Sequence, residues 1–209
     1  MTNEFITLHN QIKGITVVSP DRCFMIHQFA KYSNNLEGNI AEVGVFRGGT
    51  SKLLAKTCPN KQIHLFDTFK GMPDNNEGIR EIAKGTFAAN TGRANGYVAV
   101  VGMEMIESVK AFLQECDNVV FHKGYFPDTS APVIDEKFSF VYIDGDLYQT
   151  TKDSLEFFYP RMVSGGIMML DDWQYRLCPG VERAVNEFLE GKNEVVIQTT
   201  DYQAMIIKY

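Results

Sequence analysis

The feature that most constrains the fold of this chain is an alternation of short apolar runs with segments of helical character. Five apolar runs each lead into a glycine, a histidine or a carboxylate, helix-forming segments separate them, and two further runs lie near the end of the chain. Alternation of this kind is typical of parallel βαβ units with helices on both faces of the sheet. We therefore predict an α/β protein with a mostly parallel seven-stranded sheet. The expected strands are Asn39–Val45, Gln62–Asp67, Asn118–His122, Phe138–Asp144, Gly165–Asp171, Glu194–Thr199 and Ala204–Lys208.

The domain organisation is expected to be simple. Residues 1–209 suit one domain, with an N-terminal helical segment over about 1–37 in which Ser19 and Pro20 predict a helix start. Residues 68–102 are rich in glycine and break the strand–helix rhythm. Long irregular loops in compact domains are usually functional, so we predict a lid here. Its apolar residues would line a pocket or pack on the lid itself, and they include Phe69, Met72, Phe87 and Tyr97.

The charge balance excludes some partners. Lys and Arg number 20 against 26 Asp and Glu, a net charge of −6, and a nucleic-acid binder normally carries a basic surplus. There is no apolar run of membrane-spanning length and no signal-peptide pattern at the N-terminus. The four cysteines are scattered, which favours reduced thiols and a cytoplasmic location. A homo-oligomer is compatible with the sequence, which does not set the oligomeric state.

The turn after the first predicted strand indicates a bound cofactor. Its sequence runs from Glu42 through Gly44 to Thr50; glycine permits close approach of a ligand, and a helix N-terminus offers free N–H groups. Asp67 ends the second predicted strand, where a carboxylate can accept hydrogen bonds from ribose hydroxyls. Together these features favour a ribose-containing cofactor. The G-x-G-x-x-G pattern of dinucleotide binders is absent, which argues against NAD.

Carboxylates also follow the fourth and fifth predicted strands. Asp144 and Asp146 follow one strand, and Asp171 and Asp172 follow the next. Neighbouring carboxylates repel one another unless a cation offsets them, and oxygen ligands suit Mg²⁺. Either pair alone is equally well explained by turn-forming aspartates. The presence of both pairs on successive strands makes a magnesium site the better interpretation.

The motifs, taken in order, closely resemble the macrocin O-methyltransferase family, whose members modify sugar hydroxyls of macrolide antibiotics. The resemblance extends from about Gly38 to Leu189. Its motifs are Gly38–Thr50, Leu65–Pro73, Lys123–Thr129, Tyr142–Tyr148, Gly165-Gly166, Asp171-Asp172 and Pro179–Val181. It implies a Rossmann-like class I methyltransferase fold, S-adenosylmethionine as cofactor and Mg²⁺-dependent O-methylation of a sugar or other diol-containing small molecule, such as a glycosylated natural product.

The resemblance also implies roles for individual residues. Glu42, Gly44 and Thr50 would flank the methionine end of the cofactor. Asp67 would hold the ribose, and Thr68 is a further cofactor-binding residue. The metal ligands would be Asp144, Asp171 and Asp172. The position three residues after Asp144 is Leu147, whereas catechol-type methyltransferases carry a lysine there, so a lysine base is not available at this position.

The catalytic base stays open at this level. Asp144 and Asp146 are the candidates, and the sequence does not separate a base from a metal ligand. His122 is an alternative base, although its apolar strand favours a core position, and Tyr148 would contact substrate or pack at a helix start. Two other functions remain as alternatives, namely an NAD-type oxidoreductase and a non-catalytic protein that binds a nucleoside cofactor on the same fold.

Overall fold

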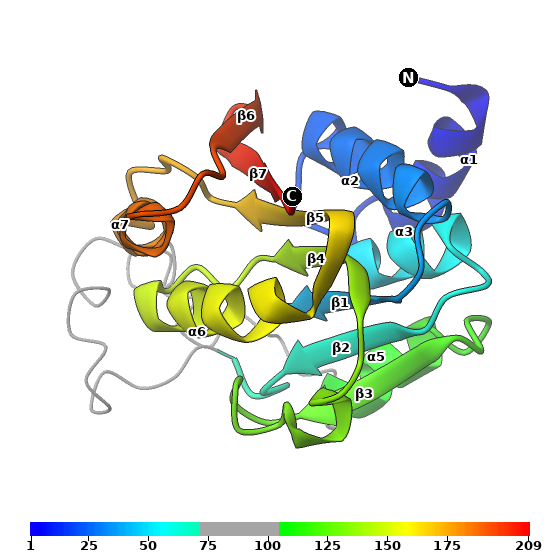
Figure 1. Cartoon of the computed structure of the whole chain (residues 1–209). Coiled ribbons are helices and arrows are strands. Elements are labelled where there is room, and N and C mark those ends of the chain that lie inside the picture. The colour runs from blue at the N-terminus through cyan, green and yellow to red at the C-terminus, as the bar shows by residue number, and fades with distance from the viewer. Residues whose placement is uncertain (72–104) are drawn as a thin grey trace.

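The structure is a computed structural model that describes residues 1–71 and 105–209. Its centre is a seven-stranded sheet in the order β3-β2-β1-β4-β5-β7-β6 (Figure 1). β7 is antiparallel to both β5 and β6, and the other neighbouring strands are parallel. The predicted α/β class and mostly parallel seven-stranded sheet are confirmed. The strands are β1 (Asn39–Val43), β2 (Ile63–Asp67), β3 (Val119–Lys123), β4 (Phe138–Ile143), β5 (Met162–Asp171), β6 (Val196–Thr200) and β7 (Gln203–Ile207).

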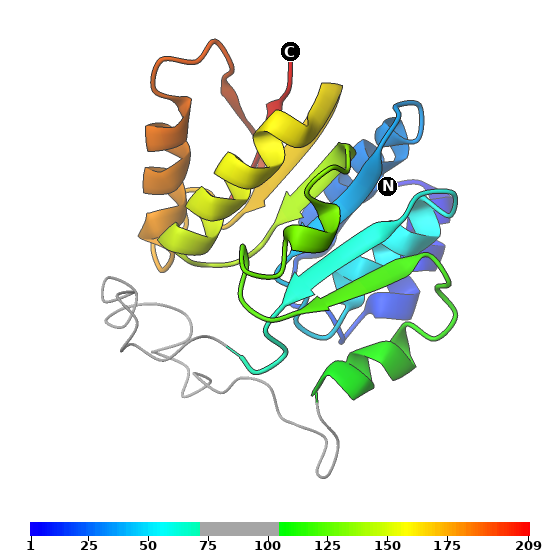
Figure 2. The same cartoon turned by 60° about the horizontal axis from the view of Figure 1, so that its bottom comes forward.

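Helices cover both faces of the sheet (Figures 1 and 2). One face packs against α1 (Asn3–Ile12), α2 (Pro20–Ser33), α3 (Gly49–Thr57) and α5 (Met105–Phe112). The other packs against α6 (Tyr148–Phe158) and α7 (Pro179–Leu189). Two short 3₁₀ helices, Ala131–Val133 and Tyr159–Arg161, precede β4 and β5. Among the helices described, none has the length and apolar character needed to cross a membrane.

Alternation along the strands assigns side chains to the two faces. Ile40 packs in the core under α1, α2, α3 and α5, whereas its neighbour Ala41 packs under α6 and α7. The same period of two directs Glu42 toward α3, and it directs Tyr142 of β4 and Met169 of β5 toward the α2 face. This alternation therefore determines which helices the side chain of each site residue contacts.

The N-terminal part is helical as predicted, but it contains two helices. α2 begins at Pro20 with Ser19 at the N-cap position, as the sequence indicates. α1 begins after Thr2, whose hydroxyl accepts a hydrogen bond from the Phe5 N–H. Of the predicted lid, residues 72–102 lie outside the described part, and with them Met72, Phe87 and Tyr97. Phe69 is buried in the core beside Phe121, so it packs rather than lines a pocket.

The register brings the carboxyl ends of three strands to one edge. Val43 of β1 pairs with Ile143 of β4, and Ile143 pairs with Leu170 of β5. These are the last paired residues of the three parallel strands, so the residues that follow them along the chain lie side by side. They are Gly44, Asp144 and Asp171. This edge includes the point where the strand order reverses, between β1 and β4, which is where α/β sheets bind ligands.

Gly44 is required by this close approach. Its φ is +94°, and a Cβ at this position would lie 1.9 Å from the Asp144 carbonyl oxygen. We expect Gly44→Ala to lower the free energy of unfolding by about 3 kcal/mol or more, because it adds overlap with backbone to left-handed strain. Urea unfolding measures this change. Gly191→Ala is the matched control, since Gly191 has φ +73° and open space around it, and it should cost only about 1 kcal/mol. Equal losses in the two variants would contradict the steric explanation.

Candidate functional site

Glu42 is a buried acid beneath the start of α3. Its side chain has no exposed surface, and its two carboxylate oxygens accept hydrogen bonds from the Thr50 and Ser51 hydroxyls. Burial raises the pKa of Glu42 to about 8, although the two hydroxyls oppose the shift. Glu42 therefore ties α3 to β1, and the predicted contact of Glu42 and Thr50 with a cofactor stays a prediction.

Asp67 links the turns that follow β1 and β2. One carboxylate oxygen accepts the backbone N–H groups of Val45 at 2.8 Å and Phe46 at 3.1 Å. The other accepts the N–H of Phe69 at 2.7 Å. Phe46 and Phe69 both adopt positive φ, at 52°, so Asp67 stabilises two backbone conformations that ordinary residues disfavour. A carboxylate offers about four acceptor positions, which leaves capacity for a ligand hydroxyl.

The remaining predicted cofactor residues surround this link. No side chain caps the first turn of α3, where Gly48 stands at the N-cap with φ +81°. Its first N–H groups are therefore suited to an anionic ligand group. The Thr68 hydroxyl donates to the Gly71 carbonyl at 2.9 Å, which shapes the turn after β2. Gly44, Asp67, Thr68 and the start of α3 thus lie at one edge of the sheet, as predicted.

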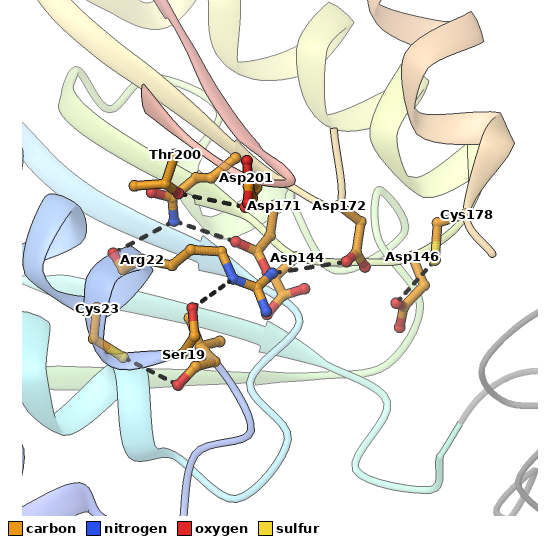
Figure 3. A network of polar contacts seen from close by, with 12 residues as sticks. Ser19, Arg22, Cys23, Asp144, Asp146, Asp171, Asp172, Cys178, Thr200 and Asp201 are labelled. Carbon is orange, nitrogen blue, oxygen red and sulfur yellow. Dashed lines mark hydrogen bonds and ion pairs between the residues drawn. The ribbon is translucent and has the colours of Figure 1, made fainter. Parts of the chain in front are cut away.

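The four predicted acids gather at the carboxyl ends of β4 and β5 (Figure 3). Burial and the charges of Asp171, Asp172 and Asp146 raise the pKa of Asp144 well above its usual range. Burial and the adjacent Asp172 do the same for the pKa of Asp146. Burial raises the pKa of Asp171 to about 7, against the opposing effect of Arg22. The arrangement is one of like charges held in a poorly solvated place, which favours a cation.

Polar neighbours hold each acid in place. Arg22 of α2 forms an ion pair with Asp171, and its guanidinium lies 3.8 Å from Asp172. The Gln203 amide donates to Asp171 at 3.2 Å, and the Tyr142 hydroxyl donates to Asp144 at 3.2 Å.

Asp146 has a different neighbour. The Cys178 thiol, at the start of α7, donates to one carboxylate oxygen of Asp146 at 3.5 Å. The carboxyl groups of Asp144 and Asp171 therefore face α2, whereas Asp146 lies on the α7 side of the cluster.

The donor chemistry of this edge fits Mg²⁺, which prefers carboxylate oxygens. Among the described residues, one group of potential ligands has donor atoms that all lie within 4.8 Å of one another, namely Asp146, Asp172 and Cys178. Asp172 belongs both to this group and to the predicted ligand set, whereas the predicted ligands Asp144 and Asp171 are not members of this group. The set predicted from the sequence stays a prediction, and the structure adds Asp146 and Cys178 to the residues that a cation could meet.

Two other candidates have structural roles. His122 lies buried against His64, with ring nitrogens 3.0 Å apart, and stacks on Phe66. Tyr148 is the first residue of α6, and its hydroxyl donates to Glu187 of α7 at 2.5 Å. His122 is therefore a core histidine, the reading that its apolar strand favours, and Tyr148 joins two helices.

Sequence reasoning missed Arg22, Gln203 and Cys178. Arg22 and Asp171 are 149 residues apart along the chain, and no motif connects them. Arg22 follows a proline-initiated helix start, which indicates a helix but gives no sign of what its third residue contacts. Only the packing of α2 on β4 and β5 brings these side chains together.

Comparisons with known proteins agree with this geometry. The model of the macrocin-O-methyltransferase (TylF) family matches residues 14–207. Demethyldecarbamoylnovobiocin O-methyltransferase of Streptomyces niveus is 32% identical over 166 residues, which are 74% of this chain and 59% of that protein. The 8-demethyl-8-(2,3-dimethoxy-alpha-L-rhamnosyl)-tetracenomycin-C 4'-O-methyltransferase of Streptomyces olivaceus is 29% identical over 155 residues, which are 70% of this chain and 57% of that protein.

Among solved structures, that of the O-methyltransferase NovP superposes with a TM-score of 0.76 at 26% identity, covering 92% of this chain and 81% of that chain. The fold is thus shared over nearly the whole chain. The matched region spans less than two thirds of the length of the two curated relatives.

The buried Glu42 gives a testable pH dependence. Its pKa in the folded chain is about 8 against an ordinary value of 4.5, so the folded state holds a proton that the unfolded state releases between these values. Its contribution to stability is present below about pH 4.5 and is lost as the pH rises toward 8.

We compare the unfolding free energies of the wild type and Glu42→Gln, and we expect their difference, wild type minus variant, to fall by about 3 kcal/mol between pH 5 and pH 8. Urea unfolding at intermediate pH values measures it, with exposed Glu37→Gln as the surface control. A difference for Glu42→Gln that does not change with pH would contradict the assignment.

Proposed function

Because the chain belongs to the macrocin O-methyltransferase family, we propose that it transfers the methyl group of S-adenosylmethionine to a hydroxyl of a small molecule, with Mg²⁺ at the β4–β5 edge. The observation that carries this proposal is the gathering of four carboxylates beside the glycine turn and Asp67, at the carboxyl edge of one sheet. Family membership favours methyl transfer over the NAD-type oxidoreductase that the sequence left open.

The cofactor side would use the turn after β1 and the end of β2. Asp67 already orders the backbone of both turns, and its one remaining acceptor position suits a hydroxyl of a ribose. The uncapped start of α3 suits the carboxylate of a methionine group. When bound, S-adenosylmethionine would supply an electrophilic methyl group. The contribution of the chain is to hold the acceptor hydroxyl in line with that methyl group.

The acceptor side would use the four acids in two roles. We assign Asp144, Asp171 and Asp172 to the metal, because Asp144 and Asp171 are oriented by hydrogen bonds from Tyr142 and Gln203. When bound, Mg²⁺ would lower the pKa of an acceptor hydroxyl.

We assign Asp146 as the base. Its carboxylate lies on the α7 side of the cluster, where the Cys178 thiol donates to one of its oxygens and Asp172 is its nearest acidic neighbour.

The acceptor that this site suits best is a sugar or another vicinal diol. Two adjacent hydroxyls can approach a carboxylate-bound cation together, which orients the one that reacts. The relatives' names point to acceptors of this kind, since one is a 4'-O-methyltransferase acting on a rhamnosyl-tetracenomycin. We therefore propose a glycosylated natural product, or a sugar precursor of one, as the substrate class.

Isothermal titration calorimetry with S-adenosylhomocysteine, with and without Mg²⁺, tests the cofactor proposal. We expect binding in both conditions. Absence of binding in both would exclude a methyltransferase. Methyl uptake from labelled S-adenosylmethionine onto a panel of glycosides and vicinal diols then tests the acceptor class, and uptake without dependence on Mg²⁺ would exclude the metal role. Binding without uptake by any acceptor would favour the non-catalytic alternative.

The base assignment predicts a specific kinetic defect. Asp146→Asn should lower kcat for methyl transfer by about 10²–10⁴-fold, because the amide does not take up the hydroxyl proton. The dissociation constant of S-adenosylhomocysteine, measured by the same calorimetry, should stay within about twofold of the wild-type value. This is smaller than the tenfold change that corresponds to about 1.4 kcal/mol of binding free energy.

Asp135→Asn is the matched control, since Asp135 is exposed and precedes β4 at the opposite end of that strand. Unchanged kcat in Asp146→Asn would reassign the base to Asp144.

A further inference from the structure

Arg22 places a fixed positive charge inside the acidic cluster. It lies in the first turn of α2, and its side chain crosses to the carboxyl ends of β4 and β5 (Figure 3). Its guanidinium forms an ion pair with Asp171 and lies 3.8 Å from Asp172, while only 17% of the side chain is exposed. Its Nε donates to the Ser19 hydroxyl at 3.2 Å, so the guanidinium is oriented from both ends.

The charge of Arg22 acts on the same three acids that are assigned to the metal. Burial works against this charge, but Asp171, Tyr142, Asp144 and Asp172 together raise the pKa of Arg22. In return Arg22 opposes the upward pKa shifts of Asp144 and Asp171. One guanidinium thus supplies the positive charge that these crowded carboxylates need.

The backbone at Arg22 is held independently of its side chain. The Gln203 amide of β7 donates to Asp171 at 3.2 Å and lies 3.5 Å from the Arg22 carbonyl oxygen. Because this link does not involve the guanidinium, α2 remains joined to β5 and β7 whichever way the Arg22 side chain points. This backbone contact would remain if the guanidinium moved away from the carboxylates.

From this geometry we propose that Arg22 is a resident counter-ion that competes with the divalent metal for Asp171 and Asp172. The proposal rests on the metal site of the proposed function. A guanidinium and a divalent cation that share these two carboxylates repel each other, so we expect metal binding to displace Arg22 from at least one of the two acids. Without metal, Arg22 keeps the acids close together and the edge of the sheet stable.

Competition and simple positioning predict opposite effects of removing the charge. If Arg22 competes, Arg22→Gln binds Mg²⁺ more tightly, because an occupant of the ligands is gone. If Arg22 only orients Asp171 as a ligand, the same substitution weakens Mg²⁺ binding. In both cases the metal-free protein loses stability, because buried carboxylates lose their partner. The sign of the change in Mg²⁺ affinity therefore separates the two roles.

The experiment is calorimetric titration of Mg²⁺ into metal-stripped wild type, Arg22→Gln and Arg22→Lys, with thermal unfolding of each in EDTA and in Mg²⁺. We expect Arg22→Gln to bind Mg²⁺ about tenfold or more tightly. Its Tm should be about 5 °C or more lower in EDTA, with a larger rise on addition of Mg²⁺. Arg22→Lys keeps the charge without the planar guanidinium, so its Mg²⁺ affinity and its Tm should lie between those of the wild type and Arg22→Gln. It also provides a readout if Arg22→Gln does not fold.

Arg161→Gln is the matched control. Arg161 donates to the Ile134 and Phe157 carbonyls at the opposite end of β5, and its loss should leave Mg²⁺ affinity unchanged. Equal or weaker Mg²⁺ binding by Arg22→Gln, or no Mg²⁺ binding by any of the proteins, would overturn the competition. Titration of S-adenosylhomocysteine on the same samples reports separately on the methyltransferase proposal, since a failure of that proposal appears as lost cofactor binding.

Discussion

The structure depends most on how it accommodates mutual repulsion among carboxylates at one edge of its sheet. Asp144, Asp146, Asp171 and Asp172 follow adjacent parallel strands whose closing residues are paired in register, so their proximity is a direct consequence of the sheet. Acids this close and this poorly solvated have raised pKa values. Such a cluster is stable only where cations and hydrogen-bond donors offset the charge.

Each donor at this edge comes from a different part of the chain. Arg22 comes from α2, Tyr142 from β4, Gln203 from β7 and Cys178 from the residue before α7. Through these contacts, the acids link helices on both faces of the sheet to its carboxyl edge. On the α2 side Asp171 has two partners, Arg22 and Gln203. On the α7 side the Cys178 thiol contacts Asp146.

The second constraint is the carboxylate of Asp67, which accepts backbone N–H groups from the turns after β1 and β2. It holds Phe46 and Phe69 at positive φ, and so it sets the course of both turns beside the acidic edge. The same residue thus has a structural role and a position suited to a ribose. Glu42 differs, because its two oxygens are already satisfied by Thr50 and Ser51 inside the core.

The sequence by itself determined the α/β class, the seven strands, the placement of the acids at one edge and the family. It could do so because these features depend on local periodicity, on turn residues and on motifs that are continuous along the chain. It could not show that the Cys178 thiol contacts Asp146, nor that Arg22 lies against Asp171.

Those facts depend on contacts between residues distant in sequence, which only the packing of α2 and α7 on the finished sheet brings together. The tertiary structure therefore decided the electrostatics of the site. The charge and hydrogen bonds around an acid come from whichever helix faces it, and no local pattern in the chain encodes that partner.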